Sequence, residues 1–322
     1  MKAVVVTKYG GPEVLQVQEV ATPTPKENEL LIKVHAACIS RAGAMMRSGT
    51  PRMARLFLGL NKPKNDIPGA CFAGVVAAMG SNVEGYEIGD AVFGEAGITF
   101  GTNAEYVAVK ADGIVLPMPD HLSFEEAAIM CDGPLTSLNF LKNLGQVKPG
   151  QKVLINGASG SLGVAAVQLA KYMGAEVTGV CSGKNAELVK SLGADHVIDY
   201  TKEDFTTLDK KYDVIYDTLG IRKFSDAKPV LTDNGIFMSP VLNGNILLPM
   251  LGNKFRSKKA KFDATGMNPV KKLSEMLQDV TEFISNKDYN FVIERRYGMD
   301  EIVEAHRLVD TGRKRGNIVL SI

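Results

Sequence analysis

The sequence predicts an α/β protein of two domains, one rich in strands and one a doubly wound nucleotide-binding domain. A glycine-rich turn at 157–163 stands between an apolar, β-branched run and a segment of small residues with helical character. Strand-like and helix-like segments then alternate as far as Tyr200, which is typical of a parallel sheet covered by helices. A chain of 322 residues is long enough for two domains of ordinary size.

The glycine-rich turn is the strongest single motif. The preceding run, KVLIN, predicts a strand buried on both faces. Gly157 would allow the tight turn, Gly160 would let the backbone approach a pyrophosphate, and Gly163 would let the helix pack closely on the sheet. Unpaired N–H groups at the start of the helix attract phosphate. Because the spacing is GxxGxxG instead of GxGxxG, helix–strand packing without a ligand is the alternative.

The end of the second predicted strand, Glu176–Val180, indicates the cofactor. A site selective for NAD normally carries an acidic residue there, which binds the ribose hydroxyls. In this chain Ser182 and Lys184 follow Cys181, so a cation replaces the carboxylate. The replacement favours the 2′-phosphate of NADP. The alternative is that Lys184 is a solvated residue in the first turn of the helix Lys184–Leu192, which precedes the third strand, His196–Tyr200.

The composition excludes several classes of protein. Hydrophobic residues make up 45% and charged residues 23%, as in an ordinary globular protein, and the net charge of +1 argues against a nucleic-acid partner. The N-terminal residues lack the pattern of a signal peptide, and no apolar stretch approaches the length of a membrane span. The four cysteines form no C-x-x-C pair, which predicts reduced thiols and a cytoplasmic location.

The first 122 residues predict a barrel-like domain of short antiparallel strands. Alternating or continuous apolar residues place these strands at Val14–Val20, Leu30–Val34, Gly74–Ala78, Asp90–Phe93 and Ala104–Val109. The long, basic segment Met45–Asn65 is either a lid over a substrate or an exposed helical insert. Ser123 and Glu126 form the capping box of the next helix.

The rest of the chain completes both domains. Strands are expected at Tyr212–Tyr216, Gly235–Ser239 and Lys261–Ala264, and helices at Arg222–Leu231, Asn268–Asn286 and Asp300–Asp310. Phe291–Ile293 and Ile318–Leu320 are expected to return as strands to the first domain. The predicted division is therefore 1–122 with 268–322 for the strand-rich domain, and 123–267 for the nucleotide-binding domain.

Motifs along nearly the whole chain carry a family resemblance. They are KYGGPEVL at Lys8–Leu15, PGACFAGVV at Pro68–Val76, GDAVFG at Gly89–Gly94, GADHVIDY at Gly193–Tyr200, YDTLG at Tyr216–Gly220, and AHRLVDTGRKRGNIVL near the C-terminus. Together with the glycine-rich loop, they resemble the medium-chain dehydrogenase/reductase superfamily, and within it the zinc-free quinone oxidoreductase, or ζ-crystallin-like, branch.

The resemblance implies a GroES-like substrate domain, a Rossmann domain and catalysis in the cleft between them. It implies a homodimer formed through an edge strand around Phe262. Thr136 would lie near the nicotinamide. The other implied cofactor contacts are Gly157, Ser159, Gly160, Ser161, Leu162 and Gly163 for the pyrophosphate, Ser182, Lys184 and Tyr200 for the 2′-phosphate, and Pro240, Val241 and Leu242 for the carboxamide.

The metal ligands of zinc-dependent relatives are replaced in this chain. A catalytic zinc takes a Cys, a His and a third Cys or acid, and keeps one position for substrate. The corresponding positions are Ser40, Ala70 and Asp132, of which only Asp132 could serve, so no metal is predicted. Three cysteines, Cys38, Cys71 and Cys131, lie within two residues of these positions and could cluster in space; the alternative is that they are small buried hydrophobes.

The residues then predict a zinc-independent oxidoreductase that transfers hydride from NADPH to a quinone or an α,β-unsaturated carbonyl. The alternatives are an alcohol dehydrogenase-like reductase of aldehydes or ketones, and an NADPH-binding protein without turnover. Ser40 and Thr136 are the candidate catalytic hydroxyls, unless both are satisfied buried groups. Many zinc-free members carry different residues at four substrate-side positions, which here are Ser40, Gly43, Cys71 and Asn317.

Overall fold

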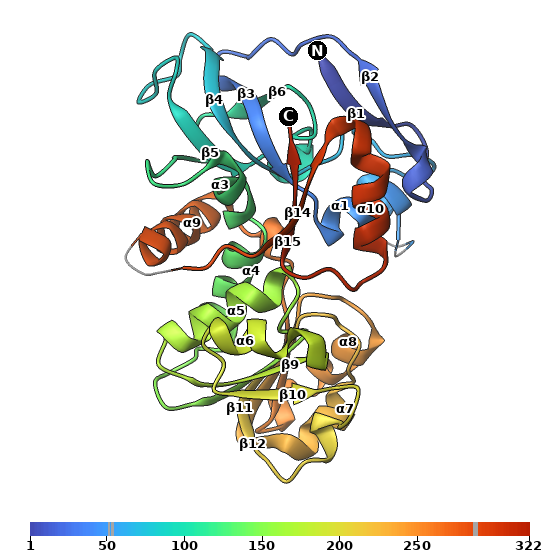
Figure 1. The fold of residues 1–322 in the computed structure, drawn as a ribbon, viewed down its shortest axis with the longest axis vertical. Helices are drawn as coiled ribbons and strands as arrows, with labels where there is room; N and C mark the ends of the chain where they lie inside the picture. Colours follow the sequence, from blue (N-terminus) through green and yellow to red (C-terminus); the bar gives the residue numbers. More distant parts are fainter. Residues whose placement is uncertain (51, 53–54, 286–288) are drawn as a thin grey trace. The chain divides into compact units, whose positions relative to one another are not determined.

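The structure is a computed structural model that describes residues 1–50, 52, 55–285 and 289–322 (Figure 1). The chain forms two compact units. The first contains Met1–Asp132, helix α9 (Val270–Ser285) and Ile293–Ile322, and the second contains Gly133–Asn268. The sequence-based division began the second domain earlier, at residue 123. In the structure α3 (Phe124–Met130) packs on β3 and β4 and so belongs to the first unit.

A mixed sheet forms the core of the first unit. In the described residues its order is β14-β15-β3-β4-β5-β7, with β6 also paired to β3, and every pair except β14–β15 is antiparallel. The strands are β3 (Glu29–Cys38), β4 (Cys71–Met79), β5 (Ala91–Glu95), β6 (Tyr106–Lys110), β7 (Ile114–Pro117), β14 (Ile293–Gly298) and β15 (Asn317–Ser321). Valine and isoleucine side chains from five of these strands, together with Leu30 and Phe72, fill one core cluster, which suits the preference of β-branched residues for packed sheets.

Smaller elements complete this unit. A separate antiparallel pair consists of β1 (Lys2–Val6) and β2 (Leu15–Glu19), and the helices besides α3 and α9 are α1 (Arg41–Ser48), α2 (Arg55–Leu58) and α10 (Ile302–Asp310). The predicted capping box of α3 is confirmed: the Glu126 N–H donates to Ser123 Oγ at 3.3 Å, and the Ser123 N–H donates to the Glu126 carboxylate at 2.9 Å. Part of the Met45–Asn65 segment lies outside the described residues.

The second unit is built on a parallel sheet. Its six described strands have the order β10-β9-β8-β11-β12-β13. They are β8 (Lys152–Asn156), β9 (Glu176–Cys181), β10 (His196–Asp199), β11 (Tyr212–Asp217), β12 (Leu231–Ser239) and β13 (Lys259–Phe262). The helices are α4 (Gly133–Leu138), α5 (Ser161–Tyr172), α6 (Ala186–Ser191), α7 (Phe224–Ala227) and α8 (Gly244–Leu251).

Strand order fixes where a ligand can bind on this sheet. From β8 the chain proceeds through α5 and α6 to β9 and β10 on one side, and from β11 it proceeds through α7 and α8 to β12 and β13 on the other (Figure 1). Right-handed crossovers in opposite directions place the two sets of helices on opposite faces. The order reverses between β8 and β11, and in open α/β sheets ligands bind beyond the carboxyl ends of the strands at such a reversal.

Prolines limit two of the expected helices. The helix expected over Arg222–Leu231 is shortened to α7 and a 3₁₀ turn, Lys228–Val230, that contains Pro229. Helix α9 begins directly after Pro269. The edge strand β13 starts two residues before the expected position, at Lys259. In the described part of the chain, no helix combines the length and apolar character needed to cross a membrane.

An ion pair joins α1 to α10 within the first unit. The Arg47 guanidinium is 2% exposed and donates to both carboxylate oxygens of Asp310, at 2.9 and 2.7 Å, whereas the Asp310 side chain is 39% exposed. Removing the partner of a buried charge costs more than removing the buried charge itself.

We therefore expect asymmetric losses of stability. Asp310→Ala should lower the free energy of unfolding by about 2 kcal/mol or more, because it leaves a buried guanidinium without its carboxylate. Arg47→Met should cost about 1 kcal/mol or less, because the remaining carboxylate can be hydrated. Urea unfolding followed by circular dichroism measures both, and equal losses in the two variants would contradict the expected asymmetry.

Candidate functional site

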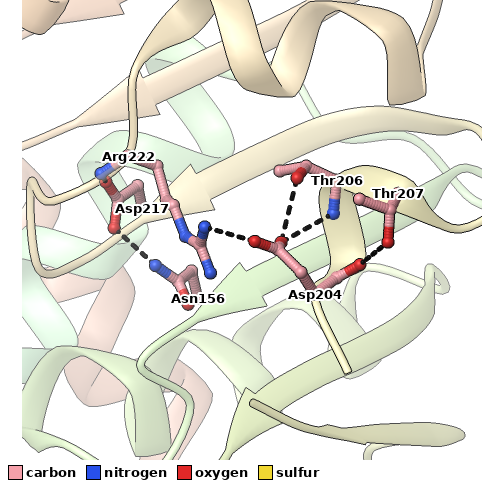
Figure 2. Close-up of polar contacts among 6 residues, drawn as sticks. All are labelled: Asn156, Asp204, Thr206, Thr207, Asp217 and Arg222. Atoms are coloured by element: carbon pink, nitrogen blue, oxygen red, sulfur yellow. Dashed lines mark hydrogen bonds and ion pairs between the residues drawn. The ribbon is translucent and has the colours of Figure 1, made fainter. Parts of the chain in front are cut away.

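The carboxyl ends of β8 and β11 are held together by a small polar network (Figure 2). The Asn156 side-chain amide donates to Asp217 Oδ1 at 2.8 Å, and the Thr218 hydroxyl donates to the carbonyl of Asn156 at 2.8 Å. Asp217 is fully buried, and burial raises its pKa above the usual value, while hydrogen bonds from the Arg222 N–H and the Asn156 amide oppose that rise. The network fixes the two strand ends at which the sheet order reverses.

The predicted glycine loop lies directly at this point. Gly157 has a φ of +82°, and a Cβ there would lie 2.5 Å from Thr218 Oγ1. A Cβ at Gly163 would lie 2.1 Å from the carbonyl oxygen of Gly157, so α5 can approach the turn only with glycine at this position. Gly160 is the N-cap of α5, and a Cβ there would meet only one atom, 3.5 Å away. The space above Gly160 and the free N–H groups of α5 fit a pyrophosphate.

The other predicted residues of the loop surround the same helix start. Ser161 and Leu162 form the first turn of α5, and the Ser159 hydroxyl accepts a hydrogen bond from the Asn185 amide at 3.0 Å. Helix α4, which carries Thr136, lies against this turn, because the Ser137 hydroxyl donates to the carbonyl of Leu162 at 2.8 Å. Thr136 itself is half-buried. The structure thus brings the predicted nicotinamide hydroxyl next to the predicted phosphate loop.

The residues predicted for the 2′-phosphate meet at the ends of β9 and β10. Cys181 pairs with Asp199 at the last register position, so Ser182, Lys184 and Tyr200 follow neighbouring strand ends. Lys184 is exposed and Tyr200 is 56% exposed. Asp199, the last residue of β10, accepts bonds from the Thr201 N–H and hydroxyl at 3.1 and 2.8 Å. That carboxylate is engaged in its own turn, and the lysine remains available to an anion.

The loop predicted for the carboxamide follows β12. Pro240 and Val241 are half-buried, and Leu242 is 47% exposed. The Val241 N–H donates to the Ser239 hydroxyl at 3.2 Å. The Asn243 amide donates to the carbonyl of Gly220 at 2.8 Å, which ties this loop to the one after β11. All three residues therefore lie at the same edge of the sheet as the glycine loop.

The residues that support the network between β8 and β11 were not predicted from the sequence. Arg222 donates to Asp204 at 2.9 Å, and Asp204 in turn accepts from the Thr206 N–H at 3.0 Å (Figure 2). The guanidinium carbon of Arg222 also lies 5.1 Å from the centre of the Phe205 ring. The quoted motif YDTLG contains Asp217 and Thr218, but nothing in its spacing indicates Asn156 or Asp204 as partners.

In the first unit, Ser40 has a structural role in addition to its predicted one. It is 9% exposed, and its hydroxyl accepts a hydrogen bond from the Gly43 N–H at 3.3 Å as the N-cap of α1. The catalytic role of Ser40 stays a prediction. The cap would persist if the hydroxyl also donated its proton to a bound substrate, because accepting and donating use different parts of the group.

The three cysteines near the relatives' ligand positions do cluster. Cys38 ends β3, Cys71 begins β4 and Cys131 follows α3, and all are buried free thiols. A hydrogen bond with Cys131, followed by burial, raises the pKa of Cys71 well above its usual value. Burial and the adjacent Asp132 carboxylate do the same to the pKa of Cys38. Cys38 and Cys71 are therefore held in their neutral form.

Two carboxyl groups complete the cluster. Burial, and then the nearby Asp132 carboxylate, raises the pKa of Glu95 to about 7. Among the described residues, no three His, Cys, Asp or Glu side chains are placed to hold a metal ion. With Ser40 and Ala70 at two of the three ligand positions, this set does not fit a catalytic zinc.

Both units match known families. Residues 26–120 match the model described as alcohol dehydrogenase GroES-like domain, and residues 192–320 match the model described as zinc-binding dehydrogenase. The chain is 33% identical over 332 aligned residues to 2-methylene-furan-3-one reductase of Solanum lycopersicum. The alignment covers 99% of this chain and 79% of that protein. The chain belongs to the medium-chain dehydrogenase/reductase superfamily. Its parallel sheet is the Rossmann domain of that superfamily, and its mixed sheet is the GroES-like domain.

Other members of the medium-chain dehydrogenase/reductase superfamily are similar as well. The NADPH-dependent alkenal/one oxidoreductase of Arabidopsis thaliana chloroplasts is 36% identical over 233 residues, which is 69% of this chain and 58% of that protein. The solved structure of the quinone oxidoreductase from Coxiella burnetii is 31% identical, with a TM-score of 0.88, and the match covers 100% of this chain and 99% of that one. Within the superfamily, the chain lies among the quinone oxidoreductase-like members.

The raised pKa of Glu95 makes stability depend on pH. An acid with a pKa near 4.5 in the unfolded chain and about 7 in the folded chain disfavours folding increasingly as pH rises from 4.5 to 7. Glu95→Gln should therefore stabilise the protein by about 2 kcal/mol at pH 8 and much less at pH 5. Urea midpoints at both pH values measure the difference. A gain that is independent of pH would contradict the assigned pKa.

Proposed function

We propose that the protein is an NADPH-dependent oxidoreductase that reduces quinones or α,β-unsaturated carbonyls without a zinc ion. The observation that carries the proposal is the pairing of a glycine-lined helix start at the sheet reversal with an exposed lysine, Lys184, after β9. The named activities of the relatives support the acceptor class: a furanone reductase, an alkenal/one oxidoreductase and a quinone oxidoreductase.

The chain's own residues would bind each part of the cofactor. The N–H groups at the start of α5 would bind the pyrophosphate, and Ser182, Lys184 and Tyr200 would bind the 2′-phosphate. Thr136 and the backbone of 240–242 would orient the nicotinamide. When bound, NADPH supplies the hydride. Much of the rate then comes from holding the reacting atoms in position.

The residues at the metal-ligand positions of the GroES-like domain indicate which class of acceptor the protein would reduce. A quinone or an enone accepts hydride at carbon and spreads the resulting charge over conjugated atoms. Direct reduction of an isolated carbonyl requires stronger polarisation of its oxygen by a metal or a positioned acid. Ser40 and Ala70 cannot supply the thiolate and imidazole of a catalytic zinc. This donor set therefore favours conjugated acceptors.

Crotonaldehyde separates the possible activities, because it carries both a conjugated double bond and an aldehyde. We expect NADPH-dependent conversion to butanal, followed by gas chromatography and by the near-ultraviolet absorbance of NADPH. Crotyl alcohol as the product would instead identify an alcohol dehydrogenase-like carbonyl reductase. Bound NADPH with no product from crotonaldehyde or phenanthrenequinone would identify a non-catalytic NADPH-binding protein.

The cofactor assignment depends on Lys184. Lys184→Glu should weaken NADPH binding about 30-fold or more, because it places a carboxylate against a phosphate, and should change NADH binding less than about threefold. Fluorescence titration of each cofactor measures both values. Lys202→Glu, at an exposed lysine beyond β10, is the matched control. Equal losses for both cofactors in the Lys184 variant would contradict the assignment.

We also infer a homodimer and a cytoplasmic location. The edge strand β13 is not fully open, because the Asn253 side chain accepts from the Ala260 N–H at 3.0 Å and donates to the Ala260 carbonyl at 2.7 Å. A second copy would therefore bind mainly through exposed apolar side chains of α8, Leu248 and Leu251, and through Phe255.

The cytoplasmic location is inferred from the cysteines. They are free and buried, which suits a reducing compartment.

Light scattering after size exclusion tests the assembly. The wild-type protein should have twice the mass of one chain, and Leu248→Glu with Leu251→Glu should reduce it to a monomer, because two carboxylates cannot be buried in an apolar contact. Ile221→Glu, at another exposed apolar residue of the same unit, should leave the dimer intact. A monomeric wild-type protein would contradict the inference.

A further inference from the structure

The end of helix α4 is held by a buried amide that none of the quoted motifs contains. Asn139 directly follows α4, is 0% exposed and belongs to the second unit, as do the residues that its side chain contacts by hydrogen bonds. Its Nδ2 donates to Asp263 Oδ2 at 2.6 Å and to Thr265 Oγ1 at 3.1 Å, and its Oδ1 accepts from the Asn143 amide at 3.0 Å. The amide therefore uses its nitrogen and its oxygen together.

The carboxylate that accepts from this amide lies at the carboxyl edge of the parallel sheet. Asp263 directly follows β13, whose last residue pairs with Ser239 at the end of β12. The Asn268 amide also donates to Asp263 Oδ2, at 2.9 Å. The polar cluster thus joins α4, at the beginning of the second unit, to the last residues of that unit. The glycine loop after β8 and the loop 240–242 after β12 follow the same edge.

The chain changes its helical form directly after α4. Residues Asn139–Leu144 form a π-helix, and the Gly145 N–H that ends it donates to the carbonyl of Phe140, five residues earlier, at 2.7 Å. The π-helix is rare in proteins and frequently occurs at functional sites. Lys261 Nζ donates at 2.7 Å to the carbonyl of the last residue of the π-helix. Both ends of this irregular turn are therefore tied to β13 and the segment that follows it.

Contacts on two opposite sides fix the rotation of α4 about its axis. Residues two apart in a helix point in directions about 200° apart, because 3.6 residues complete one turn. The Ser137 hydroxyl donates to the carbonyl of Leu162 in the first turn of α5. Asn139 donates to Asp263 on the other side of the helix. Thr136, three residues before Asn139, cannot change its direction unless one of these hydrogen bonds breaks.

We propose that Asn139 is a positioning residue for the nicotinamide half of the cofactor site and acts through Thr136. The inference rests on the proposed function, in which Thr136 orients the nicotinamide. The hydrogen bonds of Asn139 hold α4 in the rotation at which the Thr136 hydroxyl meets the nicotinamide. The phosphates are bound by other groups, the start of α5 and Lys184. Loss of the amide should therefore weaken binding of the nicotinamide half and spare the adenosine half.

A purely structural role for Asn139 predicts a different pattern of losses. A residue that only stabilised the fold would change the free energy of unfolding, and the folded protein would bind every nucleotide as before. A residue that sets the direction of Thr136 changes the affinity of the folded protein, and only for ligands that carry a nicotinamide. Comparing ligands with and without a nicotinamide therefore separates the two roles.

The first test compares NADPH with adenosine 2′,5′-bisphosphate, which carries the adenosine and the 2′-phosphate but no nicotinamide. Asn139→Leu should weaken NADPH binding about tenfold, the factor expected for one lost hydrogen bond, and should change binding of the bisphosphate less than about threefold. Isothermal titration calorimetry measures both affinities on protein whose folding is checked by circular dichroism. Equal losses for the two ligands, or an unchanged affinity for NADPH, would overturn the proposal.

Substitutions of Asp263 cover the case in which Asn139→Leu does not fold. Asp263→Asn keeps an oxygen that can accept from the Asn139 amide, so this variant should bind NADPH within about threefold of wild type. Asp263→Leu removes the acceptor and should weaken NADPH binding about tenfold. Equal NADPH affinities in the two variants would contradict positioning through this hydrogen bond.

Asp213 provides a matched control near the amino end of β11, away from the carboxyl edge of the sheet. It is half-buried like Asp263, and its carboxylate also accepts two hydrogen bonds, from the Lys152 N–H at 2.8 Å and the Thr232 hydroxyl at 3.1 Å. Asp213→Leu should lower stability but leave both nucleotide affinities within about threefold of wild type. A loss of NADPH affinity equal to that in Asp263→Leu would indicate a general effect of destabilisation and would overturn the proposal.

The second test asks whether Asn139 acts through Thr136. Thr136→Val should by itself weaken NADPH binding about tenfold, because it removes the hydroxyl that meets the nicotinamide. Both substitutions affect the same contact, so the double variant should bind NADPH no more than about threefold less tightly than the weaker single variant. Independent effects would multiply to about 100-fold, and that result would overturn the proposal.

These outcomes are separate from failure of the proposed function. If the wild-type protein bound NADPH but reduced no acceptor, the reductase assignment would fail, and the nucleotide affinities of the variants would still decide the role of Asn139. If the wild-type protein reduced acceptors and Asn139→Leu bound NADPH as tightly as wild type, only the assignment of Asn139 would fail. A wild-type protein that did not bind NADPH would contradict both.

Discussion

The hydrogen bond between Asn156 and Asp217 is the constraint on which the nucleotide-binding side of this structure depends. It joins the last residues of β8 and β11, where the order of the parallel sheet reverses. An open sheet can hold a ligand at such a point only if the two strand ends keep a fixed separation. Burial makes the bond hard to replace, because an unpaired Asp217 would be a desolvated carboxylate. The glycine turn and the loop after β11 are both positioned from these two residues.

In the GroES-like domain, the groups near the metal-ligand positions differ in charge from those of a zinc site. A catalytic zinc takes thiolate and imidazole ligands. In this chain two of the three corresponding positions are Ser40 and Ala70, and burial and neighbouring groups raise the pKa values of Cys38, Cys71 and Glu95. These raised pKa values favour the neutral forms of the three groups.

The sequence predicted the Rossmann domain closely because each of its signals is local. Strand runs and the glycine turn each depend on residues within a few positions of one another, and the geometry of the turn is confirmed by Gly157 and Gly163. The capping box of α3 in the GroES-like domain is equally local and is confirmed by Ser123. The helix ends next to Pro229 and Pro269 were predicted less well, although proline is itself a local signal that limits a helix. Contacts between distant segments carry no such local signal. Asn156 and Asp217 lie on neighbouring strands that are far apart in the sequence, and Arg47 and Asp310 come from near opposite ends of the chain.

The most direct test of the central claim, a metal-independent NADPH reductase, is turnover by chelator-treated protein. NADPH oxidation with phenanthrenequinone would be followed by absorbance after exhaustive treatment with a strong zinc chelator, with the metal content measured on the same sample. We predict an unchanged rate at less than about a tenth of an equivalent of zinc, because Ser40 and Ala70 cannot complete a zinc site. A rate that falls with the metal content and returns when zinc is added back would contradict the claim.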